Sequence, residues 1–274
     1  MARYDLSEAE WRIVEPLLPV VGKGKRRVDD RRVVNGIFYV LRTGSPWRDL
    51  PDRYGPYTTV YNRFNRWAKK GVWLGLFEAL AAQSPQSLHL IDSSIVRAHQ
   101  HAAGGKKGGP DHAIGRSRGG LSTKIHAVVD QDGLPVRLLI TPGQASDKTA
   151  VPDLLAGLPP AQALVADRGY DSRAIIDLVR NAGGEAHIPT QSRVKVQRSV
   201  DRELYRRRNL VERFFCKLKQ FRRIATRFEK HATNFLAAVA LAAARLWMRS
   251  VESSGNLWPL PSELKWLTLL AVES

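Results

Sequence analysis

LHLIDSSIV (residues 88–96) is a short run of apolar and branched residues that is interrupted by one carboxylate, Asp92. Its length and its β-branched content predict a buried strand. A carboxylate inside such a strand needs compensation, because burying an unpaired charge is costly. Asp92 is therefore a candidate functional residue, and the alternative is a structural aspartate that caps a turn.

The segments that follow this run alternate between strand patterns and helix patterns. The predicted strands are LSTKIHAVVD (121–130), LPVRLLIT (134–141), ALVADRGY (163–170) and EAHIPT (185–190). The predicted helices are SDKTAVPDLLAGL (146–158) and SRAIIDLVRNAG (172–183). Gln131-Asp132-Gly133, between the first two of these strands, is typical of a hairpin turn. Together with residues 88–96, this order predicts an α/β fold with a mixed, five-stranded sheet flanked by helices.

Residues 1–84 have a different, helical pattern. Ser7 precedes a helix pattern and has Glu10 three residues further on, which is a capping box. Three more helix patterns are RRVVNGIFYVLRTG (31–44), TTVYNRFNRWAKKG (58–71) and VWLGLFEALAAQ (72–83). They predict a small all-α domain that is helix-turn-helix-like. We therefore expect a helical domain over 1–84, an α/β domain over 85–250 and a tail over 251–274.

The charge of the chain predicts a polyanionic partner. The 274 residues include 43 Lys and Arg against 26 Asp and Glu, a formal net charge of +17. Residues 193–230 alone carry 14 basic against 4 acidic residues, so more than half of the excess lies there. Nucleic acid is the obvious polyanion. The single cysteine excludes a disulfide framework, and no apolar run reaches the roughly 18 residues of a membrane span, so we expect a cytoplasmic protein without a membrane partner.

Asp167 ends the ALVAD strand pattern and is followed by Arg168-Gly169-Tyr170. Ligands and catalytic groups favour the carboxyl ends of strands in α/β sheets. Two aspartates that face one another from strands can share a divalent metal, and oxygen-only ligands suit Mg²⁺ or Mn²⁺. The alternative for Asp167 is again an aspartate that caps a turn.

The third acidic candidate lies in the basic segment YRRRNLVERFFCKLKQFRR (205–223), whose apolar residues recur at helical spacing. At about 100° per residue, Tyr205, Arg208, Glu212 and Lys219 fall within a wedge of about 60° on one continuous helix. The wedge lies opposite the apolar side. The alternative is a solvated amphipathic helix in which Arg208 and Glu212 form an ordinary i,i+4 ion pair.

These motifs resemble the DDE transposases of bacterial insertion sequences, specifically the insertion sequence 5 family. The basic segment matches that group's signature of Tyr, two residues, Arg, three residues, Glu, six residues and Lys. Asp92 in LIDSS and Asp167 in ADRGYDS match its two aspartate motifs. The resemblance implies an RNase H-like catalytic domain with Asp92 on the first strand, Asp167 on the fourth and Glu212 on a following helix. It also implies two Mg²⁺ or Mn²⁺ ions held by these three acids.

The resemblance implies a transposase that binds terminal inverted repeats, hydrolyses phosphodiester bonds at the element's ends and joins 3′-hydroxyl ends to target DNA. Its partner would be double-stranded DNA, and it would act in the bacterial nucleoid as a homodimer or higher oligomer. The alternative is a catalytically silent, transposase-derived DNA-binding protein. The DNA contacts expected on this basis are Tyr205, Arg208, Lys219, Lys124 and Arg168, together with Arg63, Arg66 and Lys69 on an exposed helix face of the amino-terminal domain.

Overall fold

The computed structural model describes residues 3–20, 28–85, 87–103 and 112–254, and it forms two compact units. The sheet unit comprises residues 81–217. The helical unit comprises residues 1–80 and 218–274, of which the structure describes 3–20, 28–80 and 218–254.

Five main strands build the sheet unit. They are β1 (Leu88–Ala98), β3 (Gly120–Val129), β4 (Pro135–Pro142), β5 (Ala163–Val165) and β6 (Glu185–His187). Their order in the sheet is β4-β3-β1-β5-β6, in which β3 is antiparallel to β1 and β4, whereas β5 is parallel to β1 and β6. This order and these directions confirm the predicted mixed, five-stranded RNase H-like sheet. A short strand that the sequence pattern did not predict, β2 (Gly115–Ser117), pairs with the start of β3.

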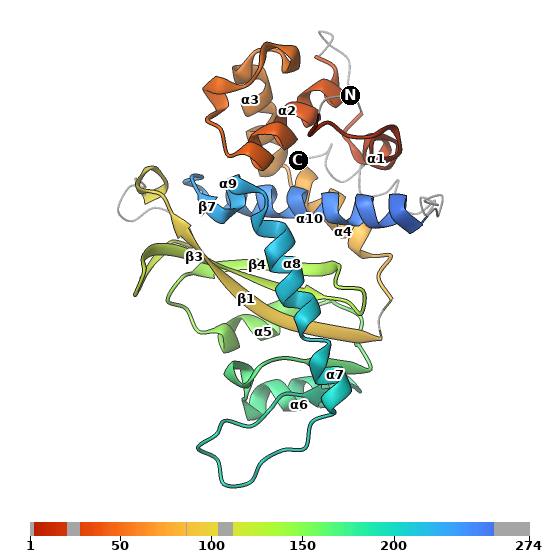
Figure 1. Ribbon diagram of the computed structural model, residues 1–274, viewed down its shortest axis with the longest axis vertical. Helices are drawn as coiled ribbons and strands as arrows, with labels where there is room; N and C mark the ends of the chain where they lie inside the picture. Colours follow the sequence, from red (N-terminus) through yellow and green to blue (C-terminus); the bar gives the residue numbers. More distant parts are fainter. Residues whose placement is uncertain (1–2, 21–27, 86, 104–111, 255–274) are drawn as a thin grey trace. The chain divides into compact units, whose positions relative to one another are not determined.

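Helices lie on both faces of this sheet. The sheet unit contains α5 (Asp147–Leu155), α6 (Arg173–Asn181), α7 (Arg202–Arg206) and most of α8 (Asn209–Lys219). Ser93 on β1 bonds to Asp147 at the start of α5, whereas its neighbour Asp92 bonds to Arg208 just before α8. In Figure 1, α8 runs in front of the strands. Because successive strand residues point to opposite faces, α5 and α8 cover opposite sides of the sheet.

The basic segment does not form the single helix that its periodicity predicts. Helix α7 ends at Arg206, and α8 begins at Asn209 after a tight turn. In this turn the amides of Leu210 and Val211 bond three residues back, to the carbonyls of Arg207 and Arg208. Such i→i+3 bonds tighten the chain relative to an α-helix. Tyr205 and Glu212 therefore belong to different helices, and the single-helix prediction is wrong here.

The helical unit is all-helical at its amino-terminal end, as predicted. Its elements are α1 (Glu8–Val14), α2 (Asp30–Thr43), α3 (Tyr57–Lys69), α4 (Val72–Ala81, whose last residue opens the sheet unit), α9 (Arg222–Ala225), the two-residue strand β7 (Thr226–Arg227) and α10 (Ala232–Ser254). The capping box of α1 is confirmed, because Ser7 and Glu10 exchange side-chain and backbone hydrogen bonds. Gly44 ends α2 in the left-handed conformation, at φ 76°, that glycine adopts without strain.

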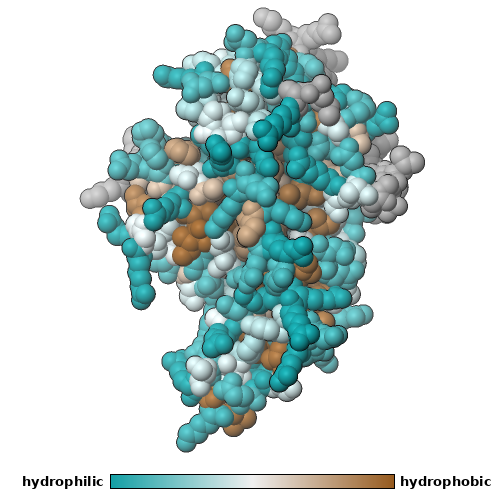
Figure 2. Space-filling model, viewed as in Figure 1, coloured by the Kyte–Doolittle hydropathy of each residue, from teal (hydrophilic) through white to brown (hydrophobic). Residues whose placement is uncertain are grey.

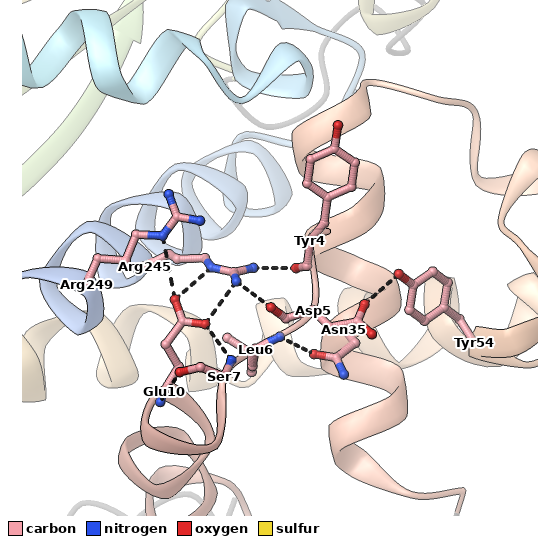
Figure 3. A network of polar contacts seen from close by, with 9 residues as sticks. All are labelled: Tyr4, Asp5, Leu6, Ser7, Glu10, Asn35, Tyr54, Arg245 and Arg249. Carbon is pink, nitrogen blue, oxygen red and sulfur yellow. Dashed lines mark hydrogen bonds and ion pairs between the residues drawn. The ribbon is translucent and has the colours of Figure 1, made fainter. Parts of the chain in front are cut away.

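A buried ion pair joins the two ends of the helical unit. The guanidinium of Arg245 on α10 bonds to both carboxylate oxygens of Glu10 on α1, at 3.1 and 2.9 Å. It also donates to the backbone carbonyls of Tyr4 and Asp5 (Figure 3). Because α10 packs on α1, α2 and α3, the contacts group residues 218–254 with the amino-terminal helices rather than with the predicted catalytic domain over 85–250. Residues 255–274 of the predicted tail lie outside the described residues.

Among the described residues, no helix is both long and apolar enough to cross a bilayer. Helix α10 is the longest of them with 23 residues, but it carries Arg245 and Arg249. Figure 2 shows hydrophilic side chains over most of the face that it draws, with smaller hydrophobic areas between them.

Candidate active site

Asp92 lies in the middle of β1, just beyond the point where the short strand β5 ends. Strand β5 pairs with residues 88–90 only, so the side chain of Asp92 is no longer covered from that edge. The side chain is 19% exposed, and one oxygen accepts the backbone amide of Ser93 at 2.8 Å. Burial raises the pKa of Asp92, and the charges of Asp167 and Glu212 raise it further, whereas the Ser93 amide and Arg208 oppose the rise. Asp92 therefore lies within electrostatic reach of both Asp167 and Glu212.

Asp167 follows β5 after one residue and begins a tight 3₁₀ turn over Arg168–Tyr170. Its Oδ1 accepts the amide of Gly169 at 2.7 Å. A Cβ atom at Gly169 would lie 2.8 Å from this oxygen, so a larger residue would displace the carboxylate. Asp167 therefore caps a turn through Oδ1, as the alternative predicts. Its other oxygen, Oδ2, could still bind a ligand.

Glu212 lies in the first turn of α8, and its side chain is 52% exposed. It accepts a hydrogen bond from Arg208, so the expected i,i+4 ion pair is present. The same guanidinium also donates to Oδ2 of Asp92 at 3.1 Å. Arg208 therefore joins the first and the third acid, which the solvated-helix alternative does not explain. Lys219 ends α8, Tyr205 lies on α7, and Arg168 is exposed beside Asp167.

Two residues that we expected to contact DNA are buried. Lys124 is 8% exposed, and its ammonium lies 2.9 Å from Asp147 and donates to the carbonyl of Ala145 at 2.8 Å. Arg63 is 5% exposed and forms an ion pair with Asp30. Their charges are neutralised inside the protein, so the prediction of DNA contacts at these two positions is corrected. Arg66 and Lys69 are exposed on α3, as predicted.

Asp147, at the start of α5, is the residue that the sequence analysis missed. Its Oδ1 accepts a hydrogen bond from Ser93 at 2.8 Å, the residue next to Asp92, and it pairs with Lys124. His126 is fully buried, and its Nδ1 lies 3.8 Å from the same oxygen. Two polar residues spaced by two on a predicted strand, Lys124 and His126, share one face and need a buried partner. That spacing was the available signal for Asp147.

The types of residue at the site suit a hard divalent cation, because Asp92, Asp167 and Glu212 offer oxygen ligands only. The raised pKa of Asp92, with its repulsion by two other carboxylates, is the electrostatic setting that a cation would relieve. In the described part of the chain, however, no three His, Cys, Asp or Glu side chains are gathered around one metal position. The guanidinium of Arg208 supplies the positive charge between Asp92 and Glu212 instead.

A cavity of about 370 Å³ lies on the other face of the sheet. Its lining consists of His89 and mainly apolar residues of α5, α6 and the segment between α5 and β5. His89 and Asp92 differ by an odd number of residues along β1, so they point to opposite faces. The cavity is therefore not part of the acidic site.

The chain matches two family models over most of its length. Residues 83–247 match the model described as "Transposase DDE domain", and residues 6–77 match the model described as "Putative transposase of IS4/5 family". The chain belongs to the DDE transposases of bacterial insertion sequences. The matched ranges of these transposase models meet between residues 77 and 83, near the end of α4.

Individual transposases are similar to parts of the chain. The "Putative transposase for insertion sequence element IS6501" of Brucella ovis is 42% identical over 133 residues, which cover 47% of this chain and 100% of that protein. The "Putative transposase for insertion sequence element IS402" of Burkholderia cepacia is 31% identical over 140 residues, covering 47% of this chain and 63% of that protein. A piggyBac transposase in a synaptic complex with hairpin DNA aligns with a TM-score of 0.47 and 11% identity, covering 96% of this chain and 75% of that one.

Proposed function

We propose that this transposase binds the terminal inverted repeats of its own element, cuts the DNA at the element's ends and joins the freed ends to target DNA. The observation that supports the proposal is that Asp92 on β1 lies within electrostatic reach of Asp167 and of Glu212, and that Arg208 bonds to both Asp92 and Glu212. The presence of two further carboxylates near Asp92 does not stabilise the fold, because like charges repel one another. A site that binds cations and phosphates accounts for it.

Asp92, Asp167 and Glu212 are the residues that would hold two Mg²⁺ or Mn²⁺ ions. Such ions, when bound, make the attacking oxygen more nucleophilic and stabilise the leaving oxygen. In the first step the oxygen of water bonds to phosphorus and loses a proton, the bond to the DNA 3′-oxygen breaks, and this oxygen takes up a proton. In the second step the oxygen of the new 3′-hydroxyl bonds to a target phosphorus and loses its proton, the bond to the target's own 3′-oxygen breaks, and that oxygen takes up a proton.

The side chains around the acids have separate roles in this proposal. Arg208, in the turn before α8, offers a planar, forked donor that suits a phosphate, and Lys219, the last residue of α8, offers a single positive charge. Tyr205 on α7 and Arg168 beside Asp167 are further candidates for DNA contacts. Arg66 and Lys69 on α3 would hold the terminal repeat, and two ends that must be cut together favour a homodimer or larger assembly acting on the nucleoid in the cytoplasm.

The direct test is cleavage of a duplex that carries the element's own end, in Mg²⁺. We expect wild-type protein to nick and join this duplex, and we expect Asp92→Asn, Asp167→Asn and Glu212→Gln each to lower the rate at least about 100-fold. Asp177→Asn is the matched control, because Asp177 is as exposed as Glu212, at 52%, but lies on α6. Full activity of the three site variants would refute the assignment, and specific binding without cleavage in either metal would favour the catalytically silent alternative.

A further inference from the structure

Arg208 makes an unusual pair of contacts for a surface arginine. It lies in the turn between α7 and α8, its side chain is only 21% exposed, and it uses two different nitrogens. Nη1 donates to Oδ2 of Asp92 at 3.1 Å, and Nη2 donates to Oε1 of Glu212. The other oxygen of Asp92 accepts the Ser93 amide. Both oxygens of Asp92 are therefore occupied by donors within the chain.

A divalent cation and this guanidinium compete for the same two carboxylates, because each would bring positive charge to Asp92 and Glu212. Arginine stays charged at every pH that a protein tolerates, so it cannot make room by losing a proton. A cation at Asp92 and Glu212 would also be repelled by a guanidinium between them. Binding of the cation is therefore more favourable once Arg208 has left at least one of its two acids.

A DNA phosphate is the natural new partner for the displaced side chain. Phosphate accepts the forked guanidinium through two parallel hydrogen bonds, as a carboxylate does. In the described structure the side-chain hydrogen bonds of Arg208 go to the two acids, so an acceptor of equal quality and higher charge can replace them.

We propose that Arg208 is a positioning residue that occupies the cation's place in the DNA-free protein and moves to a DNA phosphate when an element end binds. This inference rests on the proposed function. It couples two binding events, because DNA removes the competitor of the cation and the cation removes the competitor of the phosphate. By linkage, each ligand raises the affinity for the other by the same factor. The DNA-free protein is thereby kept poor in metal.

The test measures Mn²⁺ binding to the full-length protein without DNA, by electron paramagnetic resonance of the free ion. Asp92→Asn defines which binding belongs to the site. We expect Arg208→Gln to bind Mn²⁺ about tenfold more tightly than wild type, since a charged competitor is lost. Arg208→Lys is the decisive variant because it keeps the charge but replaces the planar fork, whose two nitrogens reach the two acids, with a compact ammonium. We expect it to bind Mn²⁺ several-fold more tightly than wild type.

Arg213→Gln is the matched control, because it removes one positive charge from an exposed position of α8 next to Glu212. We expect less than about a twofold change, since exposed charges are well screened. A second measurement adds a duplex that already ends at the cleavage point, which has no bond left to hydrolyse. This duplex should raise the Mn²⁺ affinity of wild type by a larger factor than that of either Arg208 variant.

The outcomes separate this inference from the function on which it rests. If Mn²⁺ binds in an Asp92-dependent way, but neither Arg208 variant binds it more tightly, the inference is wrong and the metal site stands. If no Mn²⁺ binding in any variant depends on Asp92, the metal site itself is wrong and the inference falls with it. Thermal melting in EDTA establishes that each variant is folded, and Arg208→Lys is the conservative substitution should Arg208→Gln fail to fold.

Discussion

Two arginines that form ion pairs in this transposase, Arg245 in the helical unit and Arg208 in the sheet unit, have opposite surroundings. Arg245 and Glu10 are 5% and 2% exposed, and the guanidinium is also held by two backbone carbonyls. Arg208 touches one acid that is 19% exposed and another that is 52% exposed. A ligand cannot reach the buried hydrogen bonds of Arg245. It can reach those of Arg208, which can therefore be replaced by bonds to the ligand. Completeness of the hydrogen bonding, rather than the ion pair itself, distinguishes a structural arginine from a functional one.

Removing the two guanidiniums tests this comparison at its strongest point. We expect Arg245→Met to lower the free energy of unfolding by about 3–5 kcal/mol, because it leaves the buried Glu10 without its closest charged partner. Arg208→Met should cost only about 1 kcal/mol, since its partners reach water. Urea denaturation followed by circular dichroism measures both values. Arg249→Met is the control, as this half-exposed neighbour lies 3.7 Å from Glu10, and equal losses for Arg245→Met and Arg208→Met would refute the distinction.

The buried contacts among His126, Lys124 and Asp147 predict that the free energy of unfolding depends on pH. Burial lowers the pKa of His126 to about 4 from 6.5, although the charge of Asp147 opposes this and Lys124 adds to it. Between these two pKa values the unfolded chain binds a proton that the folded protein refuses. Stability therefore falls as the pH drops through this window, by at most about 3 kcal/mol. Below about pH 4 this contribution changes no further.

His126→Gln removes this titration and keeps a side chain that can bond to Thr141, the present partner of Nε2 at 2.8 Å. We expect its unfolding free energy to depend less on pH between 6.5 and 4 than that of wild type. Urea denaturation at pH 7, 5.5 and 4.5 measures the difference in unfolding free energy between the two proteins. The titration of their shared carboxyl groups contributes equally to both and drops out of this difference. Parallel curves for variant and wild type would show that His126 does not refuse the proton.

Local patterns in the sequence were sufficient for the strands and for the positions of the acids. Strand length and branching predicted β1 around Asp92, and the ALVAD pattern predicted the strand end before Asp167. The spacing of the family's signature motif identified Arg208 and Glu212 as neighbouring site residues in the basic segment. These features depend on neighbours in the chain, which is why periodicity and motif spacing can identify them.

The features that the sequence could not supply are contacts between distant residues. A helical wheel placed Arg63 on a polar face, but it contains no information on Asp30, which neutralises Arg63 from α2. Lys124 is likewise neutralised by Asp147, which follows a hairpin. The break between α7 and α8 also escaped, because helical periodicity continues across a tight turn of similar pitch. Charge on an amphipathic face is thus a weak guide to DNA contacts until its partners are known.

Arg63 turns this lesson into a smaller stability prediction. Its guanidinium pairs with Asp30 and lies 5.1 Å from the ring centre of Trp67. We expect Arg63→Met to lower the free energy of unfolding by about 2 kcal/mol, less than Arg245→Met, because Asp30 is partly accessible to water. Binding to the element's end, measured by fluorescence anisotropy below the unfolding transition, should remain close to that of wild type. A large loss of DNA affinity in a folded Arg63→Met protein would restore Arg63 as a DNA contact.

The exposed cations of the same helix should behave in the opposite way. Arg66 and Lys69 lie on the exposed face of α3. Arg66→Gln and Lys69→Gln should leave the unfolding curve unchanged, because exposed charges contribute little to stability. If each contacts a phosphate, each substitution should weaken binding to the element's end and reduce the slope of log K against log salt by about 0.9. Anisotropy titrations between 50 and 200 mM salt, a range chosen on the order of physiological ionic strength, measure this slope. An unchanged slope for both variants would place the terminal-repeat contacts on another surface. A slope that changes only for Arg63→Met would show that the buried arginine, rather than the exposed residues, contacts DNA.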